Sequence, residues 1–270
     1  MTYSRTAALF LTTALLSTTG HAHKRWFMPT DFTLSDAETV TVDFTASNNI
    51  FYVDKGMPLA IVSVSNPDGA QVPLANPAEG VRRSSFDVEV DASGTYRIAA
   101  GGPPMYFVSY QLPDQPEPQR ARGSLDELKA GLPENASSVE FAESHSLIET
   151  YVTLGAGTVP EPSGDSAGLQ LQIGDYHPNE LYSDEAAQFS FTLNGEPVEG
   201  LAVSVQADGS RYRDDPEELQ YETDASGTVT VTWPRAGRYL IEAELQETPN
   251  GGEISERYYS YYLTLEVLAP

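Results

Sequence analysis

The chain has 270 residues, no cysteine and 40% hydrophobic residues, so it is long enough to bury one large core or two ordinary ones. Its 39 Asp and Glu against 15 Lys and Arg give a formal net charge of −24, which repels nucleic acid and attracts cations. The absence of cysteine excludes thiolate metal sites and cysteine nucleophiles. An acidic excess of this size is also typical of proteins adapted to salt.

Residues 1–22 have the features of a secretory signal peptide. Arg5 supplies the positive charge, residues 6–19 are uncharged and mostly apolar, and Gly20 and Ala22 place small residues at −3 and −1. The apolar run is too short to span a membrane, and no cysteine is present to carry a lipid anchor. The sequence therefore predicts cleavage after Ala22 and release into a bacterial periplasm, without stable membrane insertion.

Cleavage at this point would make His23 the first residue of the exported protein. A terminal His offers its own amine and the Nδ1 atom of its ring, and together these atoms can chelate one metal ion. One further imidazole would complete a three-nitrogen site, and such ligands suit Cu(II) and Ni(II). The alternative is a solvated chain end whose position reflects only the preference of the peptidase.

Residues 23–111 are predicted to form a first β-sandwich. Short runs alternate between apolar and polar residues and are separated by turn residues, which is the pattern of strands in a sandwich. Trp26 and Phe27 are expected to anchor the start of the chain on this sandwich. We expect strands at residues 38–44, 59–64, 85–90, 95–99 and 106–112.

Residues 112–167 are predicted to form a partly irregular bridging segment. Its beginning, residues 113–122, is rich in proline and polar residues, and residues 159–168 have the composition of a second linker. Between them, Ser124 is a candidate N-cap with Glu127 three residues later, which predicts a short helix ending near Gly131.

Residues 168–270 are predicted to form a second, immunoglobulin-like β-sandwich. Residues 93–98 (SGTYRI) are similar to residues 236–241 (AGRYLI), and a Gly followed two residues later by Tyr marks the entry to a late strand in such sandwiches. The fold class is therefore all-β, with two immunoglobulin-like sandwiches, the alternative being one larger β-domain. Strands are expected at residues 169–173, 188–193, 202–207, 227–233, 238–245 and 258–267.

Several segments resemble a family of bacterial periplasmic proteins defined by a domain of unknown function. They are residues 23–29 (HKRWFMP), 104–107 (PMYF), 148–152 (IETYV), 194–200 (NGEPVEG), 223–227 (TDASG) and 234–239 (PRAGRY). Some members of that family are associated with nickel or cobalt uptake, beside transporters and outer-membrane receptors. The resemblance implies a β-rich periplasmic protein with a metal role, and an inner-membrane metal transporter or outer-membrane receptor as its partner.

Besides His23, the exported chain contains only His145 and His177. Glu143 lies two residues before His145, so in an extended chain both side chains point the same way and the carboxylate could orient a metal-bound imidazole. His177 precedes a proline, which favours an extended or turn conformation and a structural role. We expect His23 with His145 as the first choice of ligands and His177 as the reserve, for Ni(II), Co(II) or Cu(II).

The sequence contains none of the common catalytic motifs, so no enzymatic activity is expected. The first hypothesis is a periplasmic accessory protein that binds a transition metal and delivers it to a transporter. The second is a non-enzymatic structural or adhesion module that binds a protein or glycan through an edge strand or through exposed aromatic residues among Tyr258, Tyr259, Tyr261 and Tyr262. A copper oxidase with a terminal-His brace is a third interpretation.

Overall fold

The computed structural model describes residues 23–160, 168–174 and 176–270, so the predicted signal peptide lies outside the described residues. The described chain is almost entirely β-structure and forms three sheets, which we call A, B and C. Its helices are α1 (Leu125–Ala130) and two 3₁₀ turns, η1 (Leu59–Ile61) and η2 (Ser210–Tyr212). None of the helices in the described ranges is long and apolar enough to cross a membrane.

Sheet A has five strands in the first third of the chain, and sheet C has four strands after residue 168. Sheet A contains β1 (Lys24–Pro29), β3 (Glu38–Ser47), β4 (Lys55–Gly56), β7 (Ala75–Glu79) and β8 (Ser84–Val90). Sheet C contains β13 (Leu169–Gln172), β15 (Ala186–Leu193), β16 (Glu196–Pro197) and β19 (Thr228–Thr232).

Sheet B has twelve strands and draws them from the whole length of the chain. It contains β2 (Thr33–Leu34), β5 (Val62–Ser65), β6 (Gln71–Val72), β9 (Gly94–Ala100), β10 (Met105–Gln111), β11 (Gln119–Gly123), β12 (Ser137–Leu154), β14 (Leu181–Tyr182), β17 (Ala202–Ala207), β18 (Leu219–Glu222), β20 (Gly237–Glu247) and β21 (Ile254–Leu268). At its centre β12 runs parallel to β21, while β21 also pairs antiparallel with β20.

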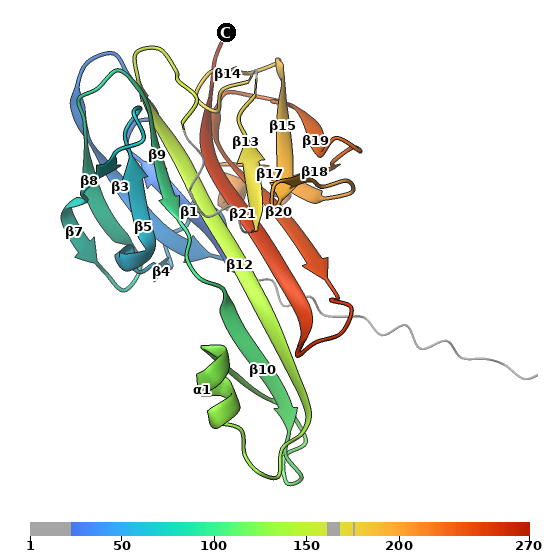
Figure 1. The fold of residues 1–270 in the computed structure, drawn as a ribbon. Helices are drawn as coiled ribbons and strands as arrows, with labels where there is room; N and C mark the ends of the chain where they lie inside the picture. The colour runs from blue at the N-terminus through green and yellow to red at the C-terminus, as the bar shows by residue number, and fades with distance from the viewer. Residues whose placement is uncertain (1–22, 161–167, 175) are drawn as a thin grey trace, which may run out of the picture.

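Sheet B is shared by two β-sandwiches, and Figure 1 shows β12 and β21 running between them. One core lies between sheets A and B and includes Ile148, Val152 and Tyr262. The other lies between sheets B and C and includes Tyr151 and Tyr261. Because successive side chains of a strand point to opposite faces, sheets A and C cover opposite faces of sheet B. The predicted all-β, immunoglobulin-like fold is confirmed.

Both sandwiches contain the corner that the internal repeat predicts. Gly94 and Gly237 have φ values of 123° and 144°, a region that favours glycine, and each opens a strand of sheet B. The Tyr96 hydroxyl accepts hydrogen bonds from the backbone of Asp91 and Ala92, and the Tyr239 hydroxyl donates one to the Arg235 carbonyl at 2.8 Å. Each Tyr therefore fixes the chain just before its strand, as in a tyrosine corner.

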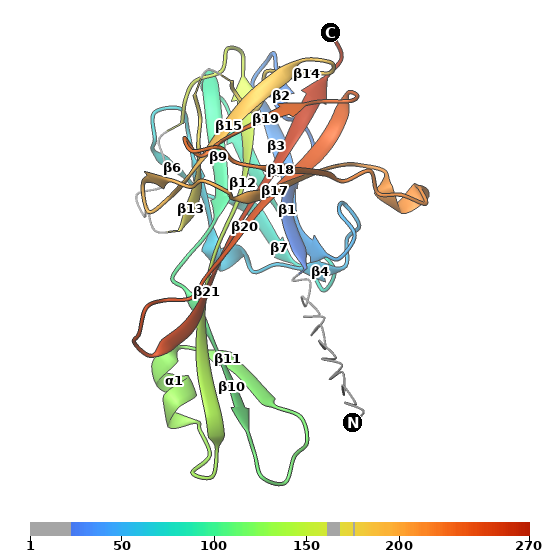
Figure 2. The same ribbon diagram turned by 90° about the vertical axis from the view of Figure 1, so that its right-hand side faces the viewer.

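A projecting arm extends below the two sandwiches, which together form the head (Figures 1 and 2). The arm consists of β10, β11, α1 and the first part of β12, together with the neighbouring ends of β20 and β21. The helix begins as predicted: the Ser124 hydroxyl accepts from the Glu127 amide, and the Glu127 carboxylate accepts from the Ser124 amide at 3.1 Å. Leu128 packs from α1 onto Val108 and Phe141, which gives the arm a small core of its own.

The described part of the bridging segment, residues 112–160, contains more regular structure than its composition indicates, while residues 161–167 of the predicted second linker lie outside the described residues. The 18 residues of β12, the longest strand, begin in this segment at Ser137 and reach Leu154 in the head. Residues 148–154 are buried on both faces of the sheet, so this half of β12 lacks the alternation of apolar and polar residues that reveals a half-exposed strand.

A buried charge lies at the centre of sheet B. Glu149 on β12 pairs with Arg97 on β9, and its Oε2 atom accepts hydrogen bonds from the hydroxyls of Tyr261 at 2.6 Å and Tyr151 at 3.2 Å. Burial, followed by the charge of Glu149, raises the pKa of both tyrosines well above the ordinary value, so they remain protonated donors. This network joins β9, β12 and β21.

Removing the carboxylate should destabilise the whole fold. We expect Glu149→Ala to lower the free energy of unfolding by about 3–5 kcal/mol, because the buried Arg97 guanidinium would lose its counter-charge. Denaturant unfolding followed by tryptophan fluorescence measures this change. The double variant R97M/E149L should lose less stability than the single variant, and an unchanged midpoint for Glu149→Ala would contradict the assigned role.

Candidate functional site: the predicted metal ligands and the face of the arm

His23 lies exposed immediately before β1. The strand that follows is firmly held, because Trp26 is 1% exposed and Phe27 is fully buried in the core between sheets A and B. Lys24 forms ion pairs with Glu218 at 2.6 Å and Glu242 at 3.0 Å. The predicted anchoring by Trp26 and Phe27 is confirmed, so His23 is attached to a rigid strand while its own ring is free to meet solvent.

His145 lies on β12 and faces the sheet C side of sheet B. Its ring stacks on Tyr259 with centroids 5.0 Å apart, and its Nε2 atom lies 3.1 Å from the Glu143 carboxylate. The sequence correctly placed Glu143 and His145 on the same side of the strand. Glu143 also accepts a hydrogen bond from Arg257 at 2.9 Å, so the imidazole belongs to a polar cluster whose charges are already paired.

His177 is 8% exposed and both of its ring nitrogens are occupied. Nδ1 accepts a hydrogen bond from the Asn179 amide at 3.1 Å, so Nε2 carries the proton and lies 3.0 Å from the Thr95 hydroxyl and 3.1 Å from the Thr158 carbonyl. Burial lowers the pKa of His177, which keeps the ring neutral. The structural interpretation of His177 fits this environment.

The structure does not bring the three histidines together. Arg25, which follows His23 by two residues, hydrogen bonds to Ser146 at 3.0 Å on the sheet A side of β12, whereas His145 points to the opposite side. His177 is close to Thr95, the cross-strand partner of Thr153, about 26 Å along β12 from His145 at a rise of about 3.3 Å per residue. Within the described ranges, no group of three or more His, Asp and Glu could hold a metal ion.

The lowered pKa of His177 predicts a pH dependence of stability. Between the folded pKa and about 6.5 the unfolded chain binds a proton that the folded ring does not, so stability falls as the pH drops below about 6.5. The loss contributed by this ring approaches at most about 1.4 kcal/mol per pH unit. Thermal unfolding of wild type and His177→Asn between neutral and mildly acidic pH tests this, and equal slopes for the two proteins would contradict it.

The arm has one covered face and one bare face. Val108 and Phe141 are cross-strand neighbours beneath α1, so their sequence neighbours Phe107 and Ala142 point the other way. We define the bare face by the side chains that the register places on that side: Met105, Phe107, Ser109, Arg120, Arg122, Glu140, Ala142, Ser144, Glu256 and Tyr258.

Three large side chains of the bare face are exposed. Met105 is 46% exposed, Phe107 40% and Tyr258 42%, and Met105 and Tyr258 are both cross-strand neighbours of Ser144. Phe107 and Tyr258 belong to the strands expected at residues 106–112 and 258–267, and Tyr258 is one of the four aromatic residues that the sequence named as candidates for an exposed surface. Tyr259, Tyr261 and Tyr262, the other candidates, are buried. The sequence did not single out Phe107, because only the position of α1 decides which side of β10 is covered.

The start of the described chain lies on the same side of sheet B as the bare face. Lys24 and Arg25 reach Glu242 and Ser146, whose side chains point to that side, and Ser146 follows Ser144 on the strand. In Figure 2, β1 begins at the lower end of the head, across from the point where the arm leaves it. His23 therefore lies on the side of sheet B that also carries the bare face.

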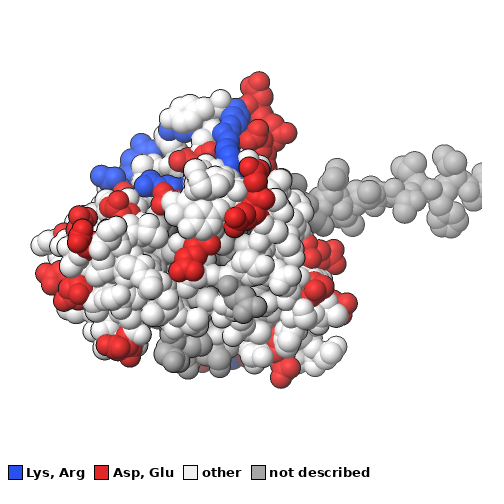
Figure 3. All heavy atoms as spheres, turned by 90° about the horizontal axis from the view of Figure 1, so that it is seen from above, with Lys and Arg blue, Asp and Glu red and all other residues white. Residues whose placement is uncertain are grey.

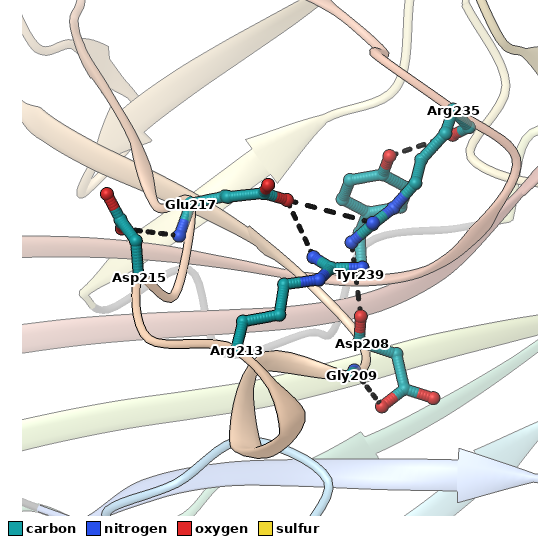
Figure 4. Close-up of polar contacts among 7 residues, drawn as sticks. All are labelled: Asp208, Gly209, Arg213, Asp215, Glu217, Arg235 and Tyr239. Atoms are coloured by element: carbon teal, nitrogen blue, oxygen red, sulfur yellow. Dashed lines mark hydrogen bonds and ion pairs between the residues drawn. The ribbon is translucent and has the colours of Figure 1, made fainter.

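An arginine-lined hollow occurs elsewhere, near the upper end of β20, where Arg213 and Arg235 lie near Arg238, which is itself paired with Glu266. Seen from above, basic side chains gather on one side of the head among acidic ones (Figure 3). In the close-up, Arg213 and Arg235 converge on Glu217, at 2.6 and 3.7 Å, and Arg235 also donates to the Asp208 carbonyl (Figure 4). Because Glu217 already occupies the position between the two guanidinium groups, the hollow offers no free anion site.

The fold and its surfaces define an immunoglobulin-like, all-β protein in which two sandwiches share one sheet and carry an arm. The sequence model of DUF4198, a domain of unknown function, matches residues 20–247, and the chain therefore belongs to this family. The match includes strands of both sandwiches and the arm, so all three are parts of the family unit.

Two solved structures are similar over most of their length. The D0-D1 domain of Intimin is 14% identical to this chain, with a TM-score of 0.23. The alignment covers 90% of this chain and 97% of the Intimin chain. The chicken CNTN1 FN1-FN3 domains are 6% identical to this chain, with a TM-score of 0.24. The alignment covers 92% of this chain and 100% of the CNTN1 chain. No curated protein sequence matches this chain.

Proposed function

We propose that this protein is an exported, non-enzymatic accessory protein that docks on a membrane transporter or receptor through the bare face of its arm. The observation that carries the proposal is the unequal covering of the arm: α1 covers one face, while Met105, Phe107 and Tyr258 are exposed on the other. Exposed aromatic and Met side chains on a rigid sheet are typical of the centre of a protein interface.

Site-specific photocrosslinking tests the docking in cells that produce the protein. A benzoylphenylalanine at Phe107 or Tyr258 should form an adduct with the same membrane protein, because both side chains lie on the bare face. The control position is Tyr212, which is 81% exposed but belongs to η2 in the head. Adducts of equal yield from all three positions, or none from Phe107 and Tyr258, would contradict the proposal.

As a second function, we propose that His23 binds Ni(II), Co(II) or Cu(II) and presents it to the docked partner. The specific support is the combination of an exposed ring with a strand fixed by Trp26 and Phe27, on the side of sheet B that also carries the bare face. After cleavage at Ala22, the free amine and Nδ1 of His23 would supply two nitrogen ligands, and groups of the partner or water would supply the others.

Calorimetric titration with Ni(II) and Cu(II) tests the metal site. We expect one ion per chain when His23 is the first residue, and an affinity at least about tenfold lower, about 1.4 kcal/mol, for His23→Ala or with one Gly added before His23. His145→Ala should bind as wild type does, because that ring points to the other side of sheet B. Equal affinities for wild type and His23→Ala would refute the terminal chelate.

A further inference from the structure

We propose that the outer edge of β11 accepts an extended acidic strand of the docked partner, which pairs with it as an additional strand of sheet B. This inference rests on the proposed docking of the arm and adds the chemistry of the partner. It is carried by two independent observations: a free strand edge and two unpaired arginines on that edge.

The first observation is the open edge. Within the described ranges β11 pairs only with β10, from Gln119 opposite Tyr110 to Gly123 opposite Tyr106, so its other side faces solvent. Residues 120–122 are exposed. Backbone N–H and C=O groups that point outward from an edge strand are a template for another strand.

The second observation concerns charge. The side chains of Arg120 and Arg122 have no hydrogen bond, ion pair or ring contact among the described residues, and the only other Lys or Arg side chain there without one is that of Lys55. The chain has 39 acidic residues, and most basic side chains in the described part form an ion pair with a carboxylate, as Arg257 does with Glu143 at 2.9 Å. Two adjacent guanidinium groups without carboxylates therefore stand out on this surface.

The register shows what these arginines would meet. Arg120 and Arg122 lie opposite Ser109 and Phe107, so both point to the bare face. A strand added beside β11 would place every second side chain next to them on that face, and cross-strand pairs of opposite charge stabilise such an arrangement. The occupant that fits has an Asp or Glu at alternate positions. Phe107 lies on the same face, one strand further in, beside Arg122.

Charge also argues against a second copy of this chain at the edge. In a symmetric antiparallel pair centred on residue 121, Arg120 of each chain lies opposite Arg122 of the other, and a pair centred on residue 120 or 122 places that arginine opposite itself. Like charges directly opposite each other destabilise a pair of strands. Charged edge residues are a known protection against such self-pairing, and the same two arginines make the edge selective for an acidic strand.

A charge exchange tests the inference with defined probes. One fluorescent peptide has Glu at every second position with Val and Thr between, and its counterpart has Lys in place of Glu. In fluorescence anisotropy, wild type should bind the Glu peptide at least about tenfold more tightly than the Lys peptide, and R120E/R122E should reverse that preference. Hydrogen exchange should show protection of the residue 119–123 amides when the Glu peptide is bound, which simple charge attraction would not produce.

Each outcome separates this inference from the proposed function. Equal binding of the two peptides, no reversal in R120E/R122E, or binding without protection of β11 would overturn the acidic-strand inference, even if Phe107 still crosslinks to a membrane protein. Conversely, preserved peptide selectivity with no crosslink from Phe107 or Tyr258 would leave the edge site standing and refute the docking on a transporter or receptor. Matching unfolding midpoints for R120E/R122E and wild type exclude misfolding as the cause.

Discussion

The parallel pairing of β12 with β21 is the interaction on which the rest of the molecule depends. It places a segment from the middle of the chain beside the last strand, so that sheets A and C can pack on opposite faces of one sheet. Parallel strands of this kind are buried on both faces. Glu149 lies within this region, and its pairing with Arg97 and two Tyr hydroxyls links three strands in one polar network. A shift of one residue would reverse which core each side chain enters.

The same strand pairing also creates the arm. Beyond the head, β12 and β21 continue together, and β10 takes the place beside β12 that β9 occupies higher up. The helix α1 is only six residues long and covers one side of this extension. The uncovered side is therefore a consequence of architecture: the sheet is longer than the layers that pack on it. The proposed docking uses this uncovered part of the sheet, because an extended and partly apolar sheet face suits a protein partner.

His23 and the bare face are complementary features of one side of the molecule. The two nitrogen ligands proposed for His23 would form an incomplete metal site, and such a site would suit transfer when a partner supplies the remaining ligands. The polar environments of His145 and His177 explain why these rings are poor candidates for that role: each is committed to hydrogen bonds that hold the fold. The acidic surface of the chain would favour the approach of a cation over that of an anion.

The sequence by itself determined the local features. Alternating runs defined most long strands, Ser124 and Glu127 defined the helix, and the repeated Gly and Tyr defined both corners, because each depends on residues only a few positions apart. Only the tertiary structure decided which faces are covered, why β12 is a strand throughout, and that His23 and His145 point to opposite sides of sheet B. These features depend on pairing between β12 and β21, more than 100 residues apart in the chain, and local alternation carries no information about such partners.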